Sequence, residues 1–478
     1  MCSSDLSLAM KRACLLHCIL ALLLPALAAA PAAWPDTPAT PPKKKFRKLR
    51  SPLKALPKPT RPVKEAPLIR EPEAAVPPAK YPTELEAPLP KHPFPVSLLM
   101  GSLRNGMFIR LPIVDTNPNR GFTYGVMPIL VLHGKDETRI RHIHAPSVTH
   151  NKTFGFVPTY RYYYYPTTKA NYQARASISK AEDREAMLQF EDMDFLGRDI
   201  AATAKVQYDV DGSKRFYGIG PDSPRGAESN FTRKTALYNF RLGLPILPES
   251  GLRFNFAHQL AGVRLAAGVI DDLPDIGVSF PEVTPDHWHQ DAEFQLYIDY
   301  DTRDEAVTTS RGVYAKIMIE NSQTDWGSEY AFQRYGTDLR AFWKPDPAAK
   351  HATAARLRYE QIIGDAPFHL MPSLGGKKLH RAYGDGRYID KGMWTASLEE
   401  RVTVYRVGVS GVSTDIELAP FVELGTVFST PKRMASRYCR PVYGIAVRAV
   451  ARPQVVGSID LGWGQEGSNV FMDINYSF

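Results

Sequence analysis

Two pairs of histidines are the clearest candidates for metal chemistry in this sequence. His142 and His144, and again His287 and His289, are separated by one residue. On a strand such a pair projects from one face, and imidazole nitrogens are common zinc ligands. No carboxylate follows either pair at a recognisable spacing. We therefore interpret both pairs as loop or interface histidines and predict neither a metal site nor a cofactor.

Other catalytic patterns are missing or incomplete. The sequence contains no Gly-x-Ser-x-Gly nucleophile motif and no phosphate-binding glycine loop. Residues 301–304 are acidic but follow a predicted strand, which favours a structural turn, and 209–212 lacks the remaining ligands of a calcium loop. We predict that the protein is not an enzyme and assign no catalytic residue.

One arginine needs partners. Arg381 lies in a segment of about 30 residues, 363–392, that is too long for an ordinary connection unless it has a function. A guanidinium in a confined, partly dehydrated space pairs with carboxylates, often bidentately. Glu423, Glu399 and Asp460 are candidate partners, because alternation puts each on the predicted inward face of a strand, as it does Arg401. The alternative is a mobile outer loop with a solvated arginine.

The elements that would hold these residues are strands. Apolar residues alternate with polar ones from about residue 121 to the end, as in 293–301, 312–320 and 415–425. In the last segment Val470, Met472, Ile474, Tyr476 and Phe478 form one apolar face. No run approaches 18 apolar residues, so no membrane helix is expected.

Alternation alone fits a soluble sandwich as well as a membrane barrel. Strands of about 10 residues, aromatic clusters near strand ends and a final strand that reaches Phe478 favour the barrel. We predict an all-β transmembrane antiparallel barrel of about 16 strands at 121–478, preceded by a pre-barrel segment at 96–120. The boundaries of the strands within 166–199 are ambiguous, so barrels of 14 and of 18 strands are kept as alternatives.

The N-terminal region differs in composition. Residues 1–30 combine Lys11-Arg12, a short apolar run and small residues, which is typical of a secretory signal peptide. Residues 31–95 hold 18 of the 40 prolines, no glycine and a net charge of +7 out of +9. This predicts a disordered, basic periplasmic linker and leaves the barrel near neutral, which argues against nucleic-acid binding. Only Cys439 lies beyond the signal peptide, so no internal disulfide is expected.

Several motifs resemble those of the BamA/TamA-type barrels, also called bacterial surface antigen barrels. In order they are Arg215-Phe-Tyr-Gly-Ile-Gly220, Tyr300-Asp-Thr-Arg-Asp304, Gly375-Gly376, His380-Arg-Ala-Tyr383, Gly386-Arg-Tyr388, Glu399-x-Arg401 and Phe421-x-Glu-x-Gly425. They span about 120–478. Ala382 replaces the glycine at the loop tip of the family, and the basic linker stands where the family carries periplasmic repeats.

The resemblance implies an outer-membrane protein that helps other proteins insert or be secreted through a seam between its first and last strands. It implies a lumenal loop held by Arg381, Tyr383, Gly375 and Gly376, and a C-terminal assembly signal at Ile474, Tyr476 and Phe478. Expected partners are outer-membrane lipid and client barrel proteins or a secreted passenger, and a homodimer is left open. The alternative function is a passive pore or structural barrel without insertase activity.

Overall fold

The computed structural model describes residues 100–478 apart from positions 104, 135–138, 249, 284–286, 410–411, 452–454 and 475. The predicted signal peptide at 1–30 and linker at 31–95 lie outside the described residues. No helix in the described part of the chain is long and apolar enough to cross a membrane.

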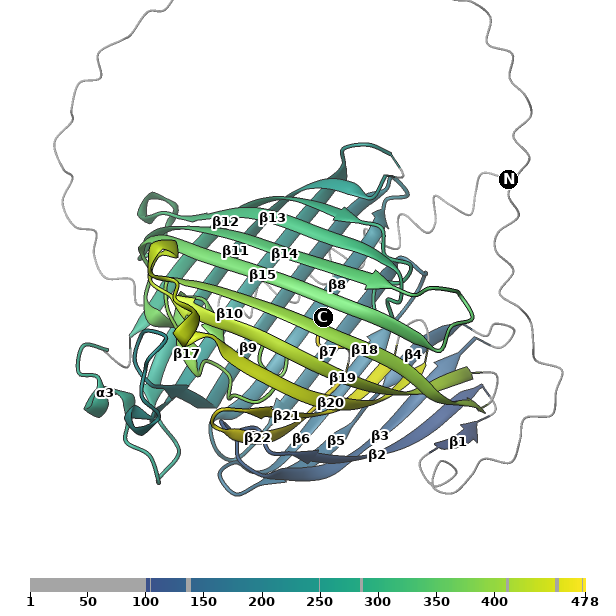
Figure 1. Cartoon of the computed structure of the whole chain (residues 1–478), viewed down its shortest axis with the longest axis horizontal. Helices are drawn as coiled ribbons and strands as arrows, with labels where there is room; N and C mark the ends of the chain where they lie inside the picture. The colour runs from purple at the N-terminus through teal and green to yellow at the C-terminus, as the bar shows by residue number, and fades with distance from the viewer. Residues whose placement is uncertain are drawn as a thin grey trace, which may run out of the picture. The chain divides into compact units, whose positions relative to one another are not determined.

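Strands make up most of these residues (Figure 1). The first half contains β1 (Met100–Leu103), β2 (Gly106–Asp115), β3 (Thr123–His133), β4 (Ile140–His144), β5 (Ser147–Asn151), β6 (Gly155–Tyr164), β7 (Ala170–Ile178), β8 (Asp183–Phe195), β9 (Ile200–Phe216), β10 (Ser229–Pro245) and β11 (Leu252–Ala267). The second half contains β12 (Trp288–Asp301), β13 (Gly312–Ser322), β14 (Ala331–Trp343), β15 (His351–Asp365), β16 (Ser373–Leu374), β17 (Tyr388–Ile389), β18 (Gly392–Val409), β19 (Val412–Phe428), β20 (Arg440–Ala451), β21 (Val455–Gly464) and β22 (Gly467–Ile474). Short helical turns interrupt the loops: η1 (Arg225–Ala227), α3 (Ile276–Ser279), η2 (Thr324–Trp326), η3 (Phe368–Leu370), η4 (Pro431–Arg433) and η5 (Ser436–Tyr438).

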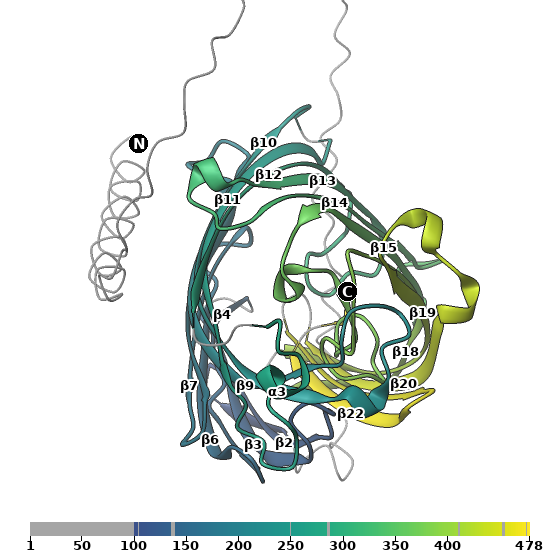
Figure 2. The same cartoon turned by 90° about the vertical axis from the view of Figure 1, so that its left-hand side faces the viewer.

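All strands except β16 and β17 belong to one 20-stranded sheet, in which successive strands pair antiparallel, except that β4 and β5 each pair with β3 and β6. The sheet curls into a ring (Figure 2). A closed ring leaves few backbone groups unpaired, which makes it the β structure that is stable in lipid. The predicted all-β antiparallel barrel is therefore confirmed.

The sheet has four strands more than the predicted 16, namely β1, β2, a fifth strand position within 121–196, and one position divided into β4 and β5. β4 and β5 each pair with both β3 and β6, so they are two halves of one interrupted strand within 121–196, where four strands were expected and five positions exist. β2 lies in the segment 96–120 that was expected to precede the barrel, yet it pairs with β3 along its whole length, from Gly106 opposite Leu132 to Asp115 opposite Thr123.

The alternation of side chains agrees with the sequence. In β13, Val313, Ile317 and Ile319 are exposed on the outer face, whereas Glu320 is buried on the inner face. In β19 the inward residues from Asp415 to Glu423 are buried at every second position. The barrel thus presents apolar side chains outward and encloses its charged ones, the reverse of a soluble domain.

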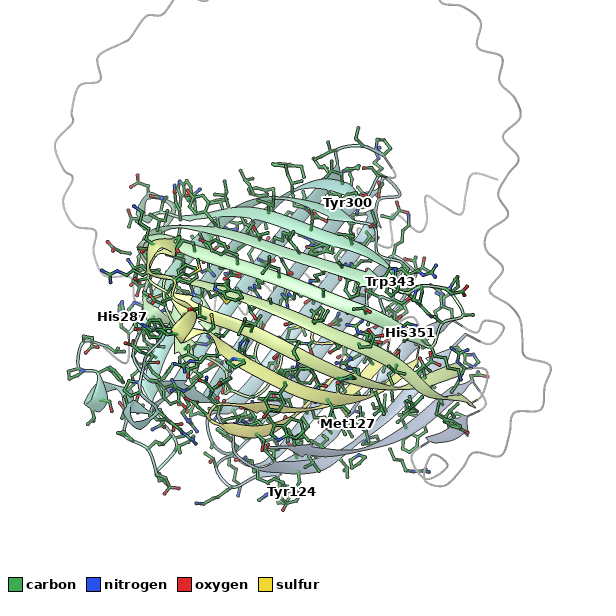
Figure 3. All side chains as sticks on the ribbon, in the orientation of Figure 1. Tyr124, Met127, His287, Tyr300, Trp343 and His351 are labelled. Atoms are coloured by element: carbon green, nitrogen blue, oxygen red, sulfur yellow. The ribbon has the colours of Figure 1, made fainter. Side chains whose placement is uncertain are left out.

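The two ends of the barrel differ. We call the end with the connections 217–228, 268–287, 323–330 and 366–391 the loop end, and the end with 302–311 and 344–350 the turn end. Tyr300, Trp343 and His351 lie at the turn end and His287 at the loop end (Figure 3). Trp343 is 61% exposed at the last position of β14, as expected for an aromatic girdle at a membrane surface.

An arginine in place of Ile317 tests this orientation. Ile317 is 64% exposed, lies opposite Ile298 and Thr337, and is near the middle of β13. Ile317→Arg is expected to lower the free energy of unfolding in lipid vesicles by about 2–4 kcal/mol, because a cation at the bilayer centre is costly. Val313→Arg, next to the turn end on the same strand, should cost only about 0–1 kcal/mol. Urea titrations followed by tryptophan fluorescence measure both values, and equal costs would argue against a bilayer around this face.

Candidate functional site

The connection between β15 and β18, residues 366–391, runs into the interior of the ring (Figure 2). It contains η3 and the small hairpin of β16 and β17. Its buried Leu374, Tyr383 and Tyr388 pack against Phe421 and Val442 of β19 and β20. The long segment that the sequence set apart is therefore an ordered element packed on the inner face of the sheet.

The two consecutive glycines shape the tip of this loop. Gly375 and Gly376 have φ of +125° and +85°, a region that favours glycine. A Cβ on Gly375 would lie 2.0 Å from the carbonyl oxygen of Gly384. The Gly376 amide donates to the carbonyl of Tyr383 (2.9 Å), which closes the turn that presents Arg381. Ala382 fits at the tip because it is not among the described residues with positive φ.

Arg381 is fully buried and reaches all three predicted carboxylates. Its Nε donates to Glu423 Oε1 (2.8 Å), and its Nη1 donates to Glu399 Oε2 (3.0 Å) and Asp460 Oδ2 (2.9 Å). Its backbone amide donates to Glu423 Oε2 (2.8 Å). Burial alone lowers the pKa of Arg381, but the carboxylates of Glu423, Glu399 and Asp460 outweigh it and raise the pKa above its ordinary value. The guanidinium is thus a permanent positive charge among three carboxylates.

Glu399 is the centre of this network. Besides Arg381 it accepts from Arg448 at both oxygens (2.6 and 2.7 Å) and from Arg401 Nε (2.8 Å). Arg401 does not pair with Arg381 and instead joins the network through Glu399. We call Arg381, Glu399, Glu423, Asp460 and Arg448 the Arg381 cluster. Its three carboxylates meet two arginines within the cluster and a third, Arg401, at its edge, so the buried charges compensate one another.

Sequence reasoning missed several members of this site. Arg448 lies on the inward face of β20, where alternation would have placed it. Phe421 lies 3.4 Å from the Arg381 guanidinium, measured to the ring centroid, close enough for a cation–π contact. Gly462 leaves space for the loop, because a Cβ there would lie 2.0 Å from the carbonyl oxygen of Arg381. A glycine on an inward face was the available signal that a backbone approaches closely.

A second contact holds the loop nearer the loop end. Arg387 donates to Glu466 through Nε (2.9 Å) and Nη2 (2.6 Å), and its guanidinium lies 4.3 Å from the ring centroids of both Tyr217 and Tyr388. Burial raises the pKa of Tyr388 to about 12, so its phenol stays protonated and donates to Glu466 (3.2 Å). This contact joins the loop to the turn between β21 and β22.

Glu466→Gln is expected to weaken this contact without unfolding the barrel. Losing a charge-assisted pair should cost about 1–2 kcal/mol, and the loop should become more accessible. Protease cleavage between residues 384 and 388 in reconstituted protein should accelerate several-fold. Lys432→Gln, an exposed change in η4 of another loop, should leave the cleavage rate unchanged. An unchanged rate in Glu466→Gln would contradict the assigned role of this pair.

The C-terminal residues do not follow the predicted strand. β22 ends at Ile474, and Tyr476 is buried inside the ring, 3.8 Å from Arg401 as measured to its ring centroid, with its hydroxyl donating to Glu417 (2.8 Å). Phe478 approaches Arg401, whose Nη2 donates to its carbonyl (3.3 Å). The expectation that Tyr476 and Phe478 continue the apolar face of a strand reaching Phe478 is wrong, because the strand ends at Ile474 and Arg401 and Glu417 bind the aromatic residues in the interior. The role of Ile474, Tyr476 and Phe478 as an assembly signal stays a prediction.

The seam between β2 and β22 is loosely paired. Thr116 N donates to Val470 O (2.8 Å), and Val470 N donates to Thr116 Oγ1 (2.8 Å). Within the described residues no regular ladder joins β2 to β22. Residues 106–109 pair with β3 on one edge, so β1, which pairs with the same residues, takes the edge that faces the seam. Four of the ten residues on that edge are therefore paired with the short strand β1 instead of β22.

The remaining candidate residues have structural partners. His142 and His144 bond the hydroxyls of Tyr162 and Tyr160 (2.9 and 2.7 Å). In the 301–304 turn, Arg303 Nη2 donates to Asp301 (2.7 Å). These contacts agree with the interface and turn roles expected from the sequence.

A ring-shaped antiparallel sheet with an apolar outer face and a charged interior is the architecture of barrel proteins of the bacterial outer membrane. The chain belongs to the Omp85 superfamily, whose domain matches residues 168–464. It is accordingly an outer-membrane β-barrel of this superfamily.

Solved structures of the same architecture are similar at low sequence identity. BamA from Haemophilus ducreyi lacking POTRA domains 1–3 is 14% identical with a TM-score of 0.46, over 77% of this chain and 74% of that chain. CdiB from Acinetobacter baumannii is 11% identical with a TM-score of 0.39, over 77% of this chain and 59% of that chain. CdiB from Escherichia coli is 8% identical with a TM-score of 0.41, over 77% of this chain and 61% of that chain. Comparison with curated proteins gave no match.

Proposed function

We propose that this barrel inserts or secretes other proteins at the outer membrane, and that its seam between β2 and β22 opens to admit or release a client segment. The observation that carries the proposal is the sparse pairing of that seam, in a sheet where most other neighbours pair along long ladders. Thr116 bonds Val470 twice, and Asp115 Oδ2 accepts from the Met472 amide (3.1 Å). An opened seam exposes unpaired amides and carbonyls, which template an incoming strand.

The loop 366–391 has a part in this mechanism. Arg381 anchors the loop on β18, β19 and β21 through Glu399, Glu423 and Asp460. β21 pairs with β22, which borders the seam, so this anchor holds the last strands in place while the first strands move. The loop and its anchor thus act as a lock on the C-terminal side of the seam.

The position of the C-terminal residues supports a seam that can change between two states of pairing. Tyr476 and Phe478 occupy the interior, where they contact Arg401 and Glu417 instead of extending β22 along β2. Releasing them would allow β22 to lengthen and to pair along β2, once β1 leaves that edge. The Ile474–Phe478 end is then both the predicted assembly signal and the segment that regulates the seam.

The expected partners are outer-membrane lipid and either client barrel proteins or a secreted passenger. The family consists of barrels for protein transport and insertion, so we assign no enzymatic reaction. A passive pore is favoured less, because the loop 366–391 runs into the interior and Tyr476 is buried there. One cavity of about 400 Å³ lies beside Tyr476 and Phe478.

Depletion of the protein followed by quantitative proteomics of the outer membrane tests this function. The loss of particular barrel proteins, or of one secreted protein, is expected as the protein is depleted. Changed permeability to small solutes with an unaltered outer-membrane proteome would overturn the proposal in favour of a pore. Re-expression of the intact chain should restore the lost proteins.

A further inference from the structure

Three donors from two segments meet at the loop end of the barrel. His287 and His289 flank Trp288 at the beginning of β12, and Glu329 lies two residues before the beginning of β14. One ligand atom from each of the three side chains lies within 4.8 Å of the others. In the described part of the chain no second group of three such donors was found. The group therefore differs from the many paired carboxylates and arginines of the interior.

The fold explains how residues 40 positions apart come together. β13 ends at Ser322, opposite Glu293, so the following turn runs beside the first residues of β12. The Glu329 amide donates to the Gln290 carbonyl (2.8 Å), and the Gln290 amide donates to Glu329 Oε1 (3.1 Å). These two bonds fix the carboxylate beside the histidines, as the outer partners of a metal ligand do.

The donor atoms converge on one place. His289 Nδ1 lies 2.9 Å from Glu329 Oε2 and 2.7 Å from the Tyr330 hydroxyl, and His287 Nε2 lies 3.7 Å from Glu329 Oε1. The ring centroids of His287 and His289 are 4.8 Å apart. Two imidazoles on one tetrahedral zinc, with Zn–N of about 2.0–2.1 Å, have ring centres about 5 Å apart. Small side-chain rotations therefore suffice to place an ion among them.

A third imidazole supplies an independent indication. His369 of η3 lies beside His289, with ring centroids 5.9 Å apart. Both of its ring nitrogens are buried, and neither has a hydrogen-bond partner. A buried imidazole without a partner is costly, and a bound ion with its water would supply one.

We propose that His287, His289 and Glu329 bind a divalent transition-metal ion, with zinc the best fit to two imidazoles and one carboxylate. This donor set matches three-ligand zinc sites that keep an open position, here next to His369. His287 is 63% exposed at its side chain, so an ion can enter from solvent. The ion would join the loop before β12 to the loop before β14 and lie against η3, which belongs to the loop that carries Arg381.

Zinc binding to the whole protein tests the site. The full chain, purified in detergent without a polyhistidine tag and stripped with a chelator, is titrated with zinc chloride against a chromophoric chelator, and bound zinc is counted by mass spectrometry. About one zinc per chain is expected. His289→Ala and Glu329→Gln should each weaken binding at least tenfold, and zinc should raise the Tm of the unaltered protein but not of Glu329→Gln.

The other histidine pair provides the matched control. His142→Ala/His144→Ala removes the same spacing from β4, where tyrosine hydroxyls are the partners, and should leave zinc binding unchanged. The metal-free Tm of each variant establishes that it has folded. Absence of a stoichiometric zinc in the unaltered protein, or equal loss in the β4 control, would overturn the proposal. Both results are independent of whether the barrel inserts proteins, because the assay requires no client.

Discussion

Arg381→Met is expected to destabilise the barrel by about 3–5 kcal/mol and to release the loop 366–391. Methionine fills much of the space of the arginine, but among the described residues it leaves Glu423 with only the backbone amide of residue 381 as a partner. Glu423 is 3% exposed, so its carboxylate cannot recover hydration without local opening. Removing one member of a buried ion network costs far more than breaking an exposed pair.

The measurement is a double-mutant cycle with Glu423→Gln, using urea unfolding in lipid vesicles and the rate of protease cleavage within 366–391. The double variant Arg381→Met/Glu423→Gln should be more stable than the sum of the single costs predicts, by at least about 1 kcal/mol, because neither charge is then left alone. Arg437→Met, at an exposed arginine that contacts Tyr438, should change neither readout. Additive costs within error would contradict the pairing.

A disulfide across the seam is expected to abolish function while leaving the barrel folded. Thr116 and Val470 are joined by two hydrogen bonds of 2.8 Å, so their backbones are close enough that we expect cysteines at these positions to reach each other. Thr116→Cys/Val470→Cys in a Cys439→Ser background should therefore oxidise readily. The oxidised protein should fail to restore the outer-membrane proteome of depleted cells, and a reducing agent should restore activity.

The matched control is a disulfide between strands that are not proposed to separate. Val114 of β2 and Tyr124 of β3 are register partners, so Val114→Cys/Tyr124→Cys cross-links a permanent ladder next to the seam. This variant should stay active when oxidised. Full activity of the oxidised seam variant would contradict opening between β2 and β22, whereas loss in both variants would assign the defect to the cross-link itself.

The outer and inner faces of the sheet could be predicted because alternation is a local property of the chain. Ile317 and Ile319 are apolar at every second position because lipid requires it, and Glu423 is polar because the interior requires it. Once the inward carboxylates were known, few partners for a buried Arg381 remained. The resemblance to known barrels identified the loop that carries Arg381, and the alternation of polar and apolar residues identified the inward carboxylates.

What could not be predicted depends on contacts between distant residues. Tyr476 continues the alternation of β22, yet Arg401 and Glu417, more than 50 positions away, draw it inward. The carboxylate beside His287 and His289 is Glu329, which reaches them only because β13 ends early and its turn runs along β12. A search for ligands at short spacing cannot find such a residue.

The sequence predicted too few strands for a related reason. The strand formed by β4 and β5 is interrupted between His144 and Ser147, and its two halves are too short for a clear alternating pattern. β2 buries Met107 and Ile109 inside the ring, in an apolar cluster with Met127 and Val131. Because both of its faces are largely apolar, β2 lacks the alternation that identified the other strands.

Site-specific photo-cross-linking in living cells tests the central claim most directly. A photoreactive residue in place of Met472 on β22, or of Val114 on β2, lies beside the seam, whereas one in place of Leu296 on β12 lies on a continuous part of the outer face. During client synthesis, both seam positions are predicted to capture nascent outer-membrane or secreted protein, and Leu296 is not. Equal capture at all three positions, or none at the seam, would contradict the account.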